Sequence, residues 1–178
     1  MCSKLTVTTA PMCEALRHVD REMCLSACRG CHNYGVRWGC PPHPTDEPAK
    51  LSRYKYLTLI SLSTQSAAET IRRLIEPTLI DIEAEVKGRA AAFAGECPYC
   101  AAECSRRSGL PCRHPEFVRP SLESVGFDVI GLAGSIQHLT FDWNNRRLTL
   151  TAALAHDCDT VSTESLIVKR LEPLLVHC

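Results

Sequence analysis

The hydrophobic pattern along the chain predicts a small sheet packed with helices. Residues 4–9 alternate apolar and polar side chains, which is typical of a short strand. Residues 51–63 carry apolar side chains on both faces, so we expect a strand in the centre of the sheet. Apolar positions over residues 66–93 follow a helical period, and Pro77 either interrupts this helix or starts a second one that ends near residue 94.

Capping residues predict further helices. A helix is expected over residues 11–22, with a proline in its first turn. Residues 121–125 are expected to form a short helix that Gly126 ends, because glycine tolerates the left-handed conformation found just after a helix. Another helix is expected over residues 128–137, since the Asp128 carboxylate can cap its first turn.

The C-terminal part is expected to hold a hairpin and a helix. The hairpin would pair residues 138–143 with residues 147–154 through a turn at Asn144 and Asn145, because asparagine tolerates positive φ. The final helix covers about residues 162–176 and carries a stripe of leucine and isoleucine. Together these elements predict an α+β fold in which one metal-binding domain spans the whole chain.

The composition describes an ordinary globular protein with one unusual feature. Of the 178 residues, 45% are hydrophobic and 22% charged, which excludes a disordered, collagen-like or coiled-coil protein. Lys and Arg together number 20, as do Asp and Glu, so the net charge is zero and we expect neither nucleic acid nor a membrane as a partner. The unusual feature is the presence of 12 cysteines.

The cysteines are expected to be reduced. The N-terminal residues carry charges where a secretory signal would carry an apolar stretch, and no apolar run reaches the ~18 residues of a membrane span. We therefore expect a cytoplasmic protein. In that compartment thiols stay reduced, and clustered cysteines bind metal more often than they form disulfides.

Eight of the 12 cysteines fall into two groups of related spacing, in loops at about residues 24–48 and 95–120. The first cysteine group, C-x3-C-x2-C-x8-C, consists of Cys24, Cys28, Cys31 and Cys40. The second cysteine group, C-x2-C-x3-C-x7-C, consists of Cys97, Cys100, Cys104 and Cys112. In each group three close cysteines place three sulfurs on one loop, and a distal cysteine supplies the fourth. The other four cysteines are expected to be incidental thiols.

Four thiolates suit either a zinc ion or a cubane iron–sulfur cluster. Structural zinc sites favour two C-x2-C pairs, whereas a triplet followed by a distal Cys-Pro, as at Cys40, is closer to the bacterial ferredoxins. We therefore expect two [4Fe-4S] clusters, with two zinc ions as the alternative. His43 and His114, which follow the distal cysteines, are reserve ligands. Five arginines either offset the charge of the clusters or are solvated surface: Arg29, Arg37, Arg106, Arg107 and Arg113.

Two clusters in one small protein favour electron transfer or another redox role, together with a redox partner protein. Two alternatives stay open: a zinc-stabilised structural or interaction module, and an iron–sulfur enzyme with a labile iron that binds substrate. The spacing C-x3-C-x2-C also occurs in radical S-adenosylmethionine enzymes. The chain is short for their barrel, however, and Cys40 offers a fourth ligand.

Two motifs resemble those of one protein family. The first is CRGCHNYGVRWGCPP, and the second joins C-x2-C to Pro-Cys-Arg-His-Pro-Glu and then to Arg-Pro-Ser-x-Glu. Over about residues 24–129 the chain is similar to a domain-of-unknown-function family of predicted metal-binding proteins. The resemblance implies a metal site of iron–sulfur type and no particular reaction. The cysteines that match its motifs best are Cys31, Cys40, Cys97, Cys100, Cys104 and Cys112.

Overall fold

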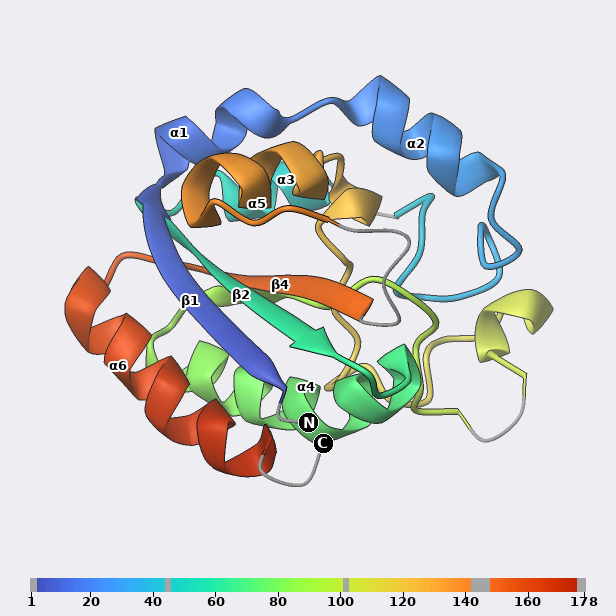
Figure 1. Ribbon diagram of the computed structural model, residues 1–178. Helices are drawn as coiled ribbons and strands as arrows, with labels where there is room; N and C mark the ends of the chain where they lie inside the picture. Colours follow the sequence, from blue (N-terminus) through green and yellow to red (C-terminus); the bar gives the residue numbers. More distant parts are fainter. Residues whose placement is uncertain (1–2, 44–45, 101–102, 142–147, 176–178) are drawn as a thin grey trace.

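A four-stranded antiparallel sheet forms the centre of the computed structural model, which describes residues 3–43, 46–100, 103–141 and 148–175 (Figure 1). The strand order is β1-β2-β4-β3. The bounds are β1 Lys4–Pro11, β2 Tyr56–Thr64, β3 Arg89–Ala91 and β4 Leu148–His156. The fold is therefore α+β, as predicted.

Strand β2 is central, which confirms the prediction from its two apolar faces. Ile60 pairs with Val7 on β1 and with Ala152 on β4. The strand begins later than predicted, at Tyr56, because residues Glu47–Leu51 form a short helix, α3, in which Leu51 is buried.

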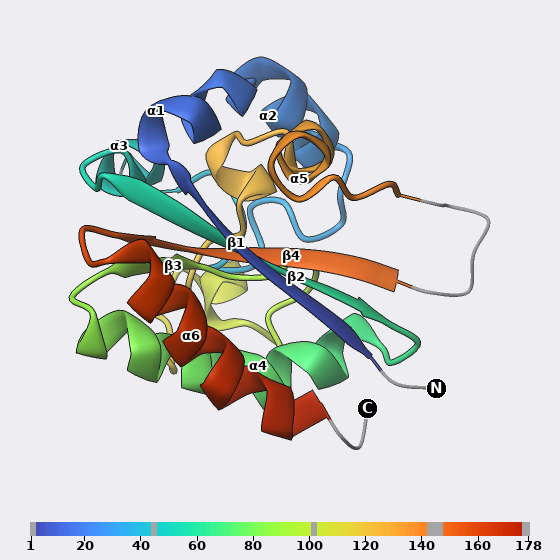
Figure 2. The ribbon, with the colours of Figure 1, turned by 60° about the vertical axis from the view of Figure 1, so that its left-hand side comes forward.

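Helices cover both faces of the sheet (Figure 2). Helices α4 and α6 lie on one face, and α1, α2, α3 and α5 lie on the other. Successive strand residues point to opposite faces, so Ile60 packs in the core under α4 and α6 whereas Leu59 packs in the core of the other face. The further bounds are α1 Met12–Ala15, α2 Arg21–Arg29, α4 Ala68–Glu85, α5 Val129–Gln137 and α6 Thr160–Leu171.

Helix α4 runs through Pro77 without ending, so the predicted interruption is wrong. A proline inside a helix costs about 3 kcal/mol. Four apolar side chains of this helix are fully or almost fully buried, and each contributes roughly 1.5–3 kcal/mol, which outweighs that cost. They are Ile71, Ile75, Leu79 and Ile82. The predicted end near residue 94 is also wrong, because the helix stops at Glu85 and β3 follows.

The helix predicted over residues 11–22 is split into two. Helix α1 passes into a 3-10 turn at Leu16–His18, and Val19 then adopts an extended conformation and forms a bridge with Phe127. Helix α2 starts afresh after Asp20, whose carboxylate accepts a hydrogen bond from the Met23 N–H at 2.9 Å. The capping aspartate therefore decides where the second helix begins.

The segment that follows the second cysteine group matches its prediction. A 3-10 helix covers Glu123–Val125 and ends at Gly126, whose φ is +98°. Asp128 then caps α5 by accepting a hydrogen bond from the Gly131 N–H at 3.1 Å.

The predicted hairpin is not observed. Residues 138–141 form no strand, and β4 pairs with β2 and β3 instead, because its apolar residues on both faces suit an interior strand. The predicted turn at Asn144 and Asn145 lies outside the described residues. The last helix, α6, ends earlier than predicted, at Leu171, and a 3-10 turn over Glu172–Leu175 follows it. Within the described ranges, no helix combines the length and the apolar character needed to cross a membrane.

The buried His156 predicts a pH-dependent stability. It is 0% exposed, its Nε2 lies 2.8 Å from Thr58 Oγ1, and burial lowers its pKa below the ordinary value of 6.5. Because the unfolded chain takes up this proton more readily, the stabilisation is complete above about pH 6.5 and is lost as the pH falls below it. Thermal unfolding between about pH 7 and pH 5 should show a steeper loss of Tm for the wild type than for His156→Gln. The exposed His32→Gln should keep the wild-type slope, and equal slopes for all three proteins would contradict the prediction.

Candidate metal centre

The first cysteine group is built by α2 and the loop that follows it. Cys24 and Cys28 are one turn apart on the helix and therefore share a face. Cys31 lies in the turn after the helix, where its N–H donates to the Cys28 carbonyl at 3.0 Å. Gly35, with φ of +72°, donates to the Pro41 carbonyl at 2.9 Å, and this closed loop brings Cys40 back towards the helix end.

The second cysteine group lies on a loop whose two ends are joined. The Ala92 N–H donates to the Pro120 carbonyl at 2.9 Å, so the chain enters and leaves the loop at the same place. Inside the loop a 3-10 helix over Ser105–Ser108 ends at Gly109, which has φ of +67°. Ser105 Oγ also donates to the Pro111 carbonyl at 2.7 Å. These bonds order the loop independently of the thiols.

In the first group neighbouring thiols affect one another's ionisation. Burial, together with the nearby Asp128 and Cys28, raises the pKa of Cys24 to about 11. Burial also raises the pKa of Cys40 to about 11, with a contribution from Cys31 in the same direction. Cys40 is therefore near the end of α2.

The second group behaves in the same way. Burial raises the pKa of Cys97, and Cys100 adds to the shift, while the Tyr99 N–H opposes it. Burial likewise raises the pKa of Cys112, with contributions from Cys104 and Cys100 that are opposed by the backbone N–H of His114. The thiols that raise each pKa belong to the same group in every case. These couplings link cysteines within each group, and the assignment of the eight cysteines to two sites stays a prediction.

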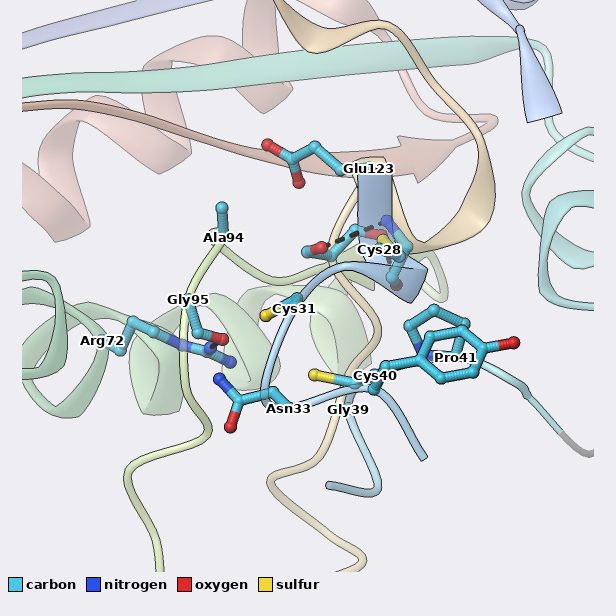
Figure 3. Close-up of a pocket in the computed structure, with 13 residues that line it drawn as sticks. Cys28, Cys31, Asn33, Gly39, Cys40, Pro41, Arg72, Ala94, Gly95 and Glu123 are labelled. Carbon is cyan, nitrogen blue, oxygen red and sulfur yellow. Dashed lines mark hydrogen bonds between the residues drawn. The ribbon is translucent and has the colours of Figure 1, made fainter. Parts of the chain in front are cut away.

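A cavity separates the thiols of the first group from the start of α4 (Figure 3). Figure 3 shows the sulfurs of Cys31 and Cys40 pointing into one space, with the Arg72 guanidinium and the Asn33 amide on its other side. Its volume of about 150 Å³ is roughly ten times what one water molecule needs. The space therefore has room for a group of several atoms.

A buried ion pair on α4 joins the two cysteine groups. Arg72 is 4% exposed, and its Nε donates to Glu76 Oε1 at 2.6 Å. A second guanidinium nitrogen donates to the Gly95 carbonyl at 2.5 Å, and Tyr99 Oη donates to Glu76 Oε2 at 3.1 Å. The positive charge of Arg72 acts to lower the pKa of Cys40 and of Cys97, so this one cation lies near both groups.

Arg106 ties the second cysteine loop to the first. Its guanidinium donates to the backbone carbonyls of Arg37 and Cys40, both at 2.7 Å, and to that of Pro42. The same guanidinium lies 5.2 Å from the centre of the Trp38 ring. An ion pair between Arg37 and Glu96 adds a second link between the loops. The two loops therefore form one connected surface.

The two reserve histidines have partners other than the thiols. His43 Nε2 lies 3.0 Å from Ser124 Oγ, and burial lowers the pKa of this imidazole. His114 Nδ1 is 3.9 Å from a Glu116 carboxylate oxygen. The backbone N–H of His114, by contrast, donates to Cys112 Sγ at 3.4 Å. Such N–H···S bonds stabilise metal-bound thiolates and tune the metal.

In the described part of the chain, no three Cys, His, Asp or Glu side chains lie close enough together to hold a single metal ion. Zn–S bonds of about 2.3 Å place the sulfurs of a tetrahedral zinc site roughly 3.8 Å apart. A cubane cluster binds each thiolate at a different iron and therefore accepts thiols that are further apart.

Comparison with known proteins places the chain in a family. The profile of one protein family, described as predicted metal-binding protein (DUF2284), matches residues 17–154. The chain belongs to this family. The matched region contains both cysteine groups, and the predicted membership of a family of predicted metal-binding proteins is thereby confirmed. Searches of curated proteins and of solved structures gave no significant match.

Arg72, whose charge acts on cysteines of both groups, is not among the five arginines that the sequence singles out. Of those five, Arg37 and Arg106 link the loops, Arg107 forms an exposed pair with Glu103, and Arg29 and Arg113 are exposed. Arg72 lies more than twenty positions from either group. The one signal for it in the sequence is its i,i+4 spacing to Glu76 within an apolar helical stripe.

Loss of the buried cation should destabilise the protein strongly. Arg72→Met would leave the Glu76 carboxylate buried without its partner, which costs about 3–5 kcal/mol of the free energy of unfolding. Arg73→Met is a matched control on the same helix, since it breaks the exposed i,i+4 pair with Glu69 and should cost about 0.5 kcal/mol or less. Urea unfolding measures both losses, and similar values for the two variants would contradict the role of Arg72.

Loss of the Arg106 contacts should loosen the loops without unfolding the sheet. Arg106→Gln removes charged hydrogen bonds to three carbonyls, each worth about 1.5–3 kcal/mol. Amide hydrogen exchange over residues 31–43 should become roughly tenfold to a hundredfold faster, whereas the amides of β2 should keep their protection. Arg107→Gln is the control, because Arg107 contacts only the surface residue Glu103 in the described structure. The prediction fails if exchange over residues 31–43 is the same in both variants.

Proposed function

We propose that the protein binds two [4Fe-4S] clusters and acts in electron transfer or as another redox component. Each cluster would occupy one cysteine group. The proposed ligands are Cys24, Cys28, Cys31 and Cys40 for one cluster, and Cys97, Cys100, Cys104 and Cys112 for the other.

The observation that carries this proposal is the arrangement of the thiols. Thiols of one group lie close enough to shift one another's pKa, yet no three of the described metal-binding side chains converge on a point where one ion would fit. A cubane, with its irons at separate corners, suits that spacing. The cavity beside Cys28, Cys31 and Cys40 also has room for a group larger than an ion.

The charges around the loops support the same proposal. A cubane with four thiolates is an anion, and its burial is costly unless cations and N–H dipoles offset the charge. Arg72 and Arg106 supply two cations, and the N–H groups of Tyr99 and His114 point at sulfurs of the second group. These features are what a protein needs in order to stabilise a cluster and set its potential.

When bound, such clusters supply one-electron oxidation and reduction. The residues of the chain would hold the two cysteine groups beside each other, through the contacts of Arg72 and Arg106. Tyr34, which lines the cavity of the first group, would limit water there. Cys31 is exposed, which leaves the first group accessible from the surface. We therefore include in the proposal a redox partner protein that docks there, and a cytoplasmic location, where thiols remain reduced.

Metal analysis of the anaerobically purified protein tests the proposal. We expect a brown protein with about eight iron atoms and eight sulfides per chain. Cys40→Ser should lose about half of the iron and the matching part of the visible absorption. Cys13→Ser, which removes an exposed thiol outside both groups, should lose none. A colourless protein with about two zinc ions per chain would refute the proposal in favour of a zinc-stabilised module.

A further inference from the structure

A second and larger cavity adjoins the first cysteine group on its other side. It lies between α2, the start of α5 and the start of β4, and its volume is about 550 Å³. Its walls are mainly apolar, with Phe127, Val129 and Leu150 among them. Both the size and the apolar lining are typical of sites that bind small organic molecules.

The two cavities share a wall. Cys28 and Cys31 line the larger cavity as well as the cavity between the thiols, and so do Ala94 and Glu123. Cys24 lines the larger cavity but not the smaller one. A molecule bound in the larger cavity would therefore touch the proposed ligands of the first cluster. That this molecule lies beside a cluster rests on the function proposed above.

The charges on the wall indicate which kind of molecule fits. Apart from the thiols, the ionisable side chains among the described residues that line the cavity are Glu123 and Asp128, and this lining contains no Lys, Arg or His. Glu123 Oε2 is buried and has no hydrogen-bond partner among the described residues. A buried oxygen without a partner is costly, and a donor on a bound molecule would satisfy it.

We infer that this cavity binds a small organic cation: an apolar molecule with one amino group, held against the first cysteine group. Its apolar body would fill the space beside Phe127 and Leu150, and its ammonium would donate to Glu123 Oε2 near Asp128. An anionic molecule of the same shape would bind more weakly, because it would lie beside the carboxyl groups of Glu123 and Asp128 and would offer no donor to Glu123 Oε2.

Binding of three matched probes tests this inference. Phenethylamine, phenethyl alcohol and phenylacetate have similar apolar bodies and are respectively cationic, neutral and anionic at neutral pH. Titration calorimetry on the full chain should show that the amine binds roughly tenfold or more tightly than the alcohol, and that phenylacetate binds most weakly. Equal affinity for the amine and the alcohol would overturn the inference.

Variants with matched controls locate the binding site. Glu123→Gln keeps the shape of the side chain and should weaken phenethylamine binding by about tenfold while leaving phenethyl alcohol unaffected. Ala27→Trp adds a large side chain on the lining from an exposed position of α2 and should abolish binding of both. Glu22→Gln and Ser26→Trp change exposed residues of the same helix outside the cavity and should bind like the wild type. Unchanged binding in Ala27→Trp would show that the site lies elsewhere.

The same experiment separates this inference from the proposed clusters. If the protein carries iron–sulfur clusters, phenethylamine should also change the visible circular dichroism of the cluster, and Ala27→Trp should remove that change. If it carries zinc or no metal, selective amine binding that depends on Glu123 would sustain the cavity inference while the cluster proposal fails. If the protein carries clusters but does not bind phenethylamine, the cluster proposal is sustained and the cavity inference fails.

Discussion

The buried ion pair between Arg72 and Glu76 is the constraint on which the arrangement of the two cysteine loops depends. Removal of two charges from water costs several kcal/mol for each ion, so such a pair persists only where further hydrogen bonds complete it. Here the Gly95 carbonyl and the Tyr99 hydroxyl complete it, and both belong to the second loop. The pair therefore fixes where that loop leaves the helix layer. Because Arg72 also borders the cavity of the first group, the same contacts set the two groups beside each other.

The helix that carries this pair is held by the sheet, which explains why the pair can be buried at all. Helix α4 packs its apolar stripe against β2 and β4, and that packing outweighs the cost of Pro77. Arg72 lies next to Ile71 on this helix and so is carried beneath the loops. Arg106 also joins two segments through its side chain, since its guanidinium donates to three backbone carbonyls of the neighbouring loop. Arginine thus serves here as a structural cation that joins segments far apart in sequence.

The sequence pattern predicted those elements that depend on interactions between neighbouring residues. The central strand, the helix capped by Asp128 and the stop at Gly126 were all predictable, because burial on both faces, a carboxylate cap and a positive φ each depend on a few neighbouring residues. The pairing of β4 was not, since it depends on which distant strand offers the matching apolar faces. The two cysteine sets are predicted from spacing alone. Arg72 is not, because its role arises from a fold that brings residues of α4 to loops more than twenty positions away.

The contacts that order the two cysteine loops do not involve the thiols, and this affects how metal binding is coupled to folding and to pH. In a small zinc finger the metal bonds supply the folding energy, so the apo-protein is unfolded. Here the bridge at Ala92, the Arg106 contacts and the Arg72–Glu76 pair hold the loops through backbone carbonyls and other side chains. Burial raises the pKa of Cys24 and of Cys40 to about 11, which disfavours the thiolate forms of these two side chains. A metal or cluster that binds these two thiols would displace their protons. Its affinity would therefore rise with pH.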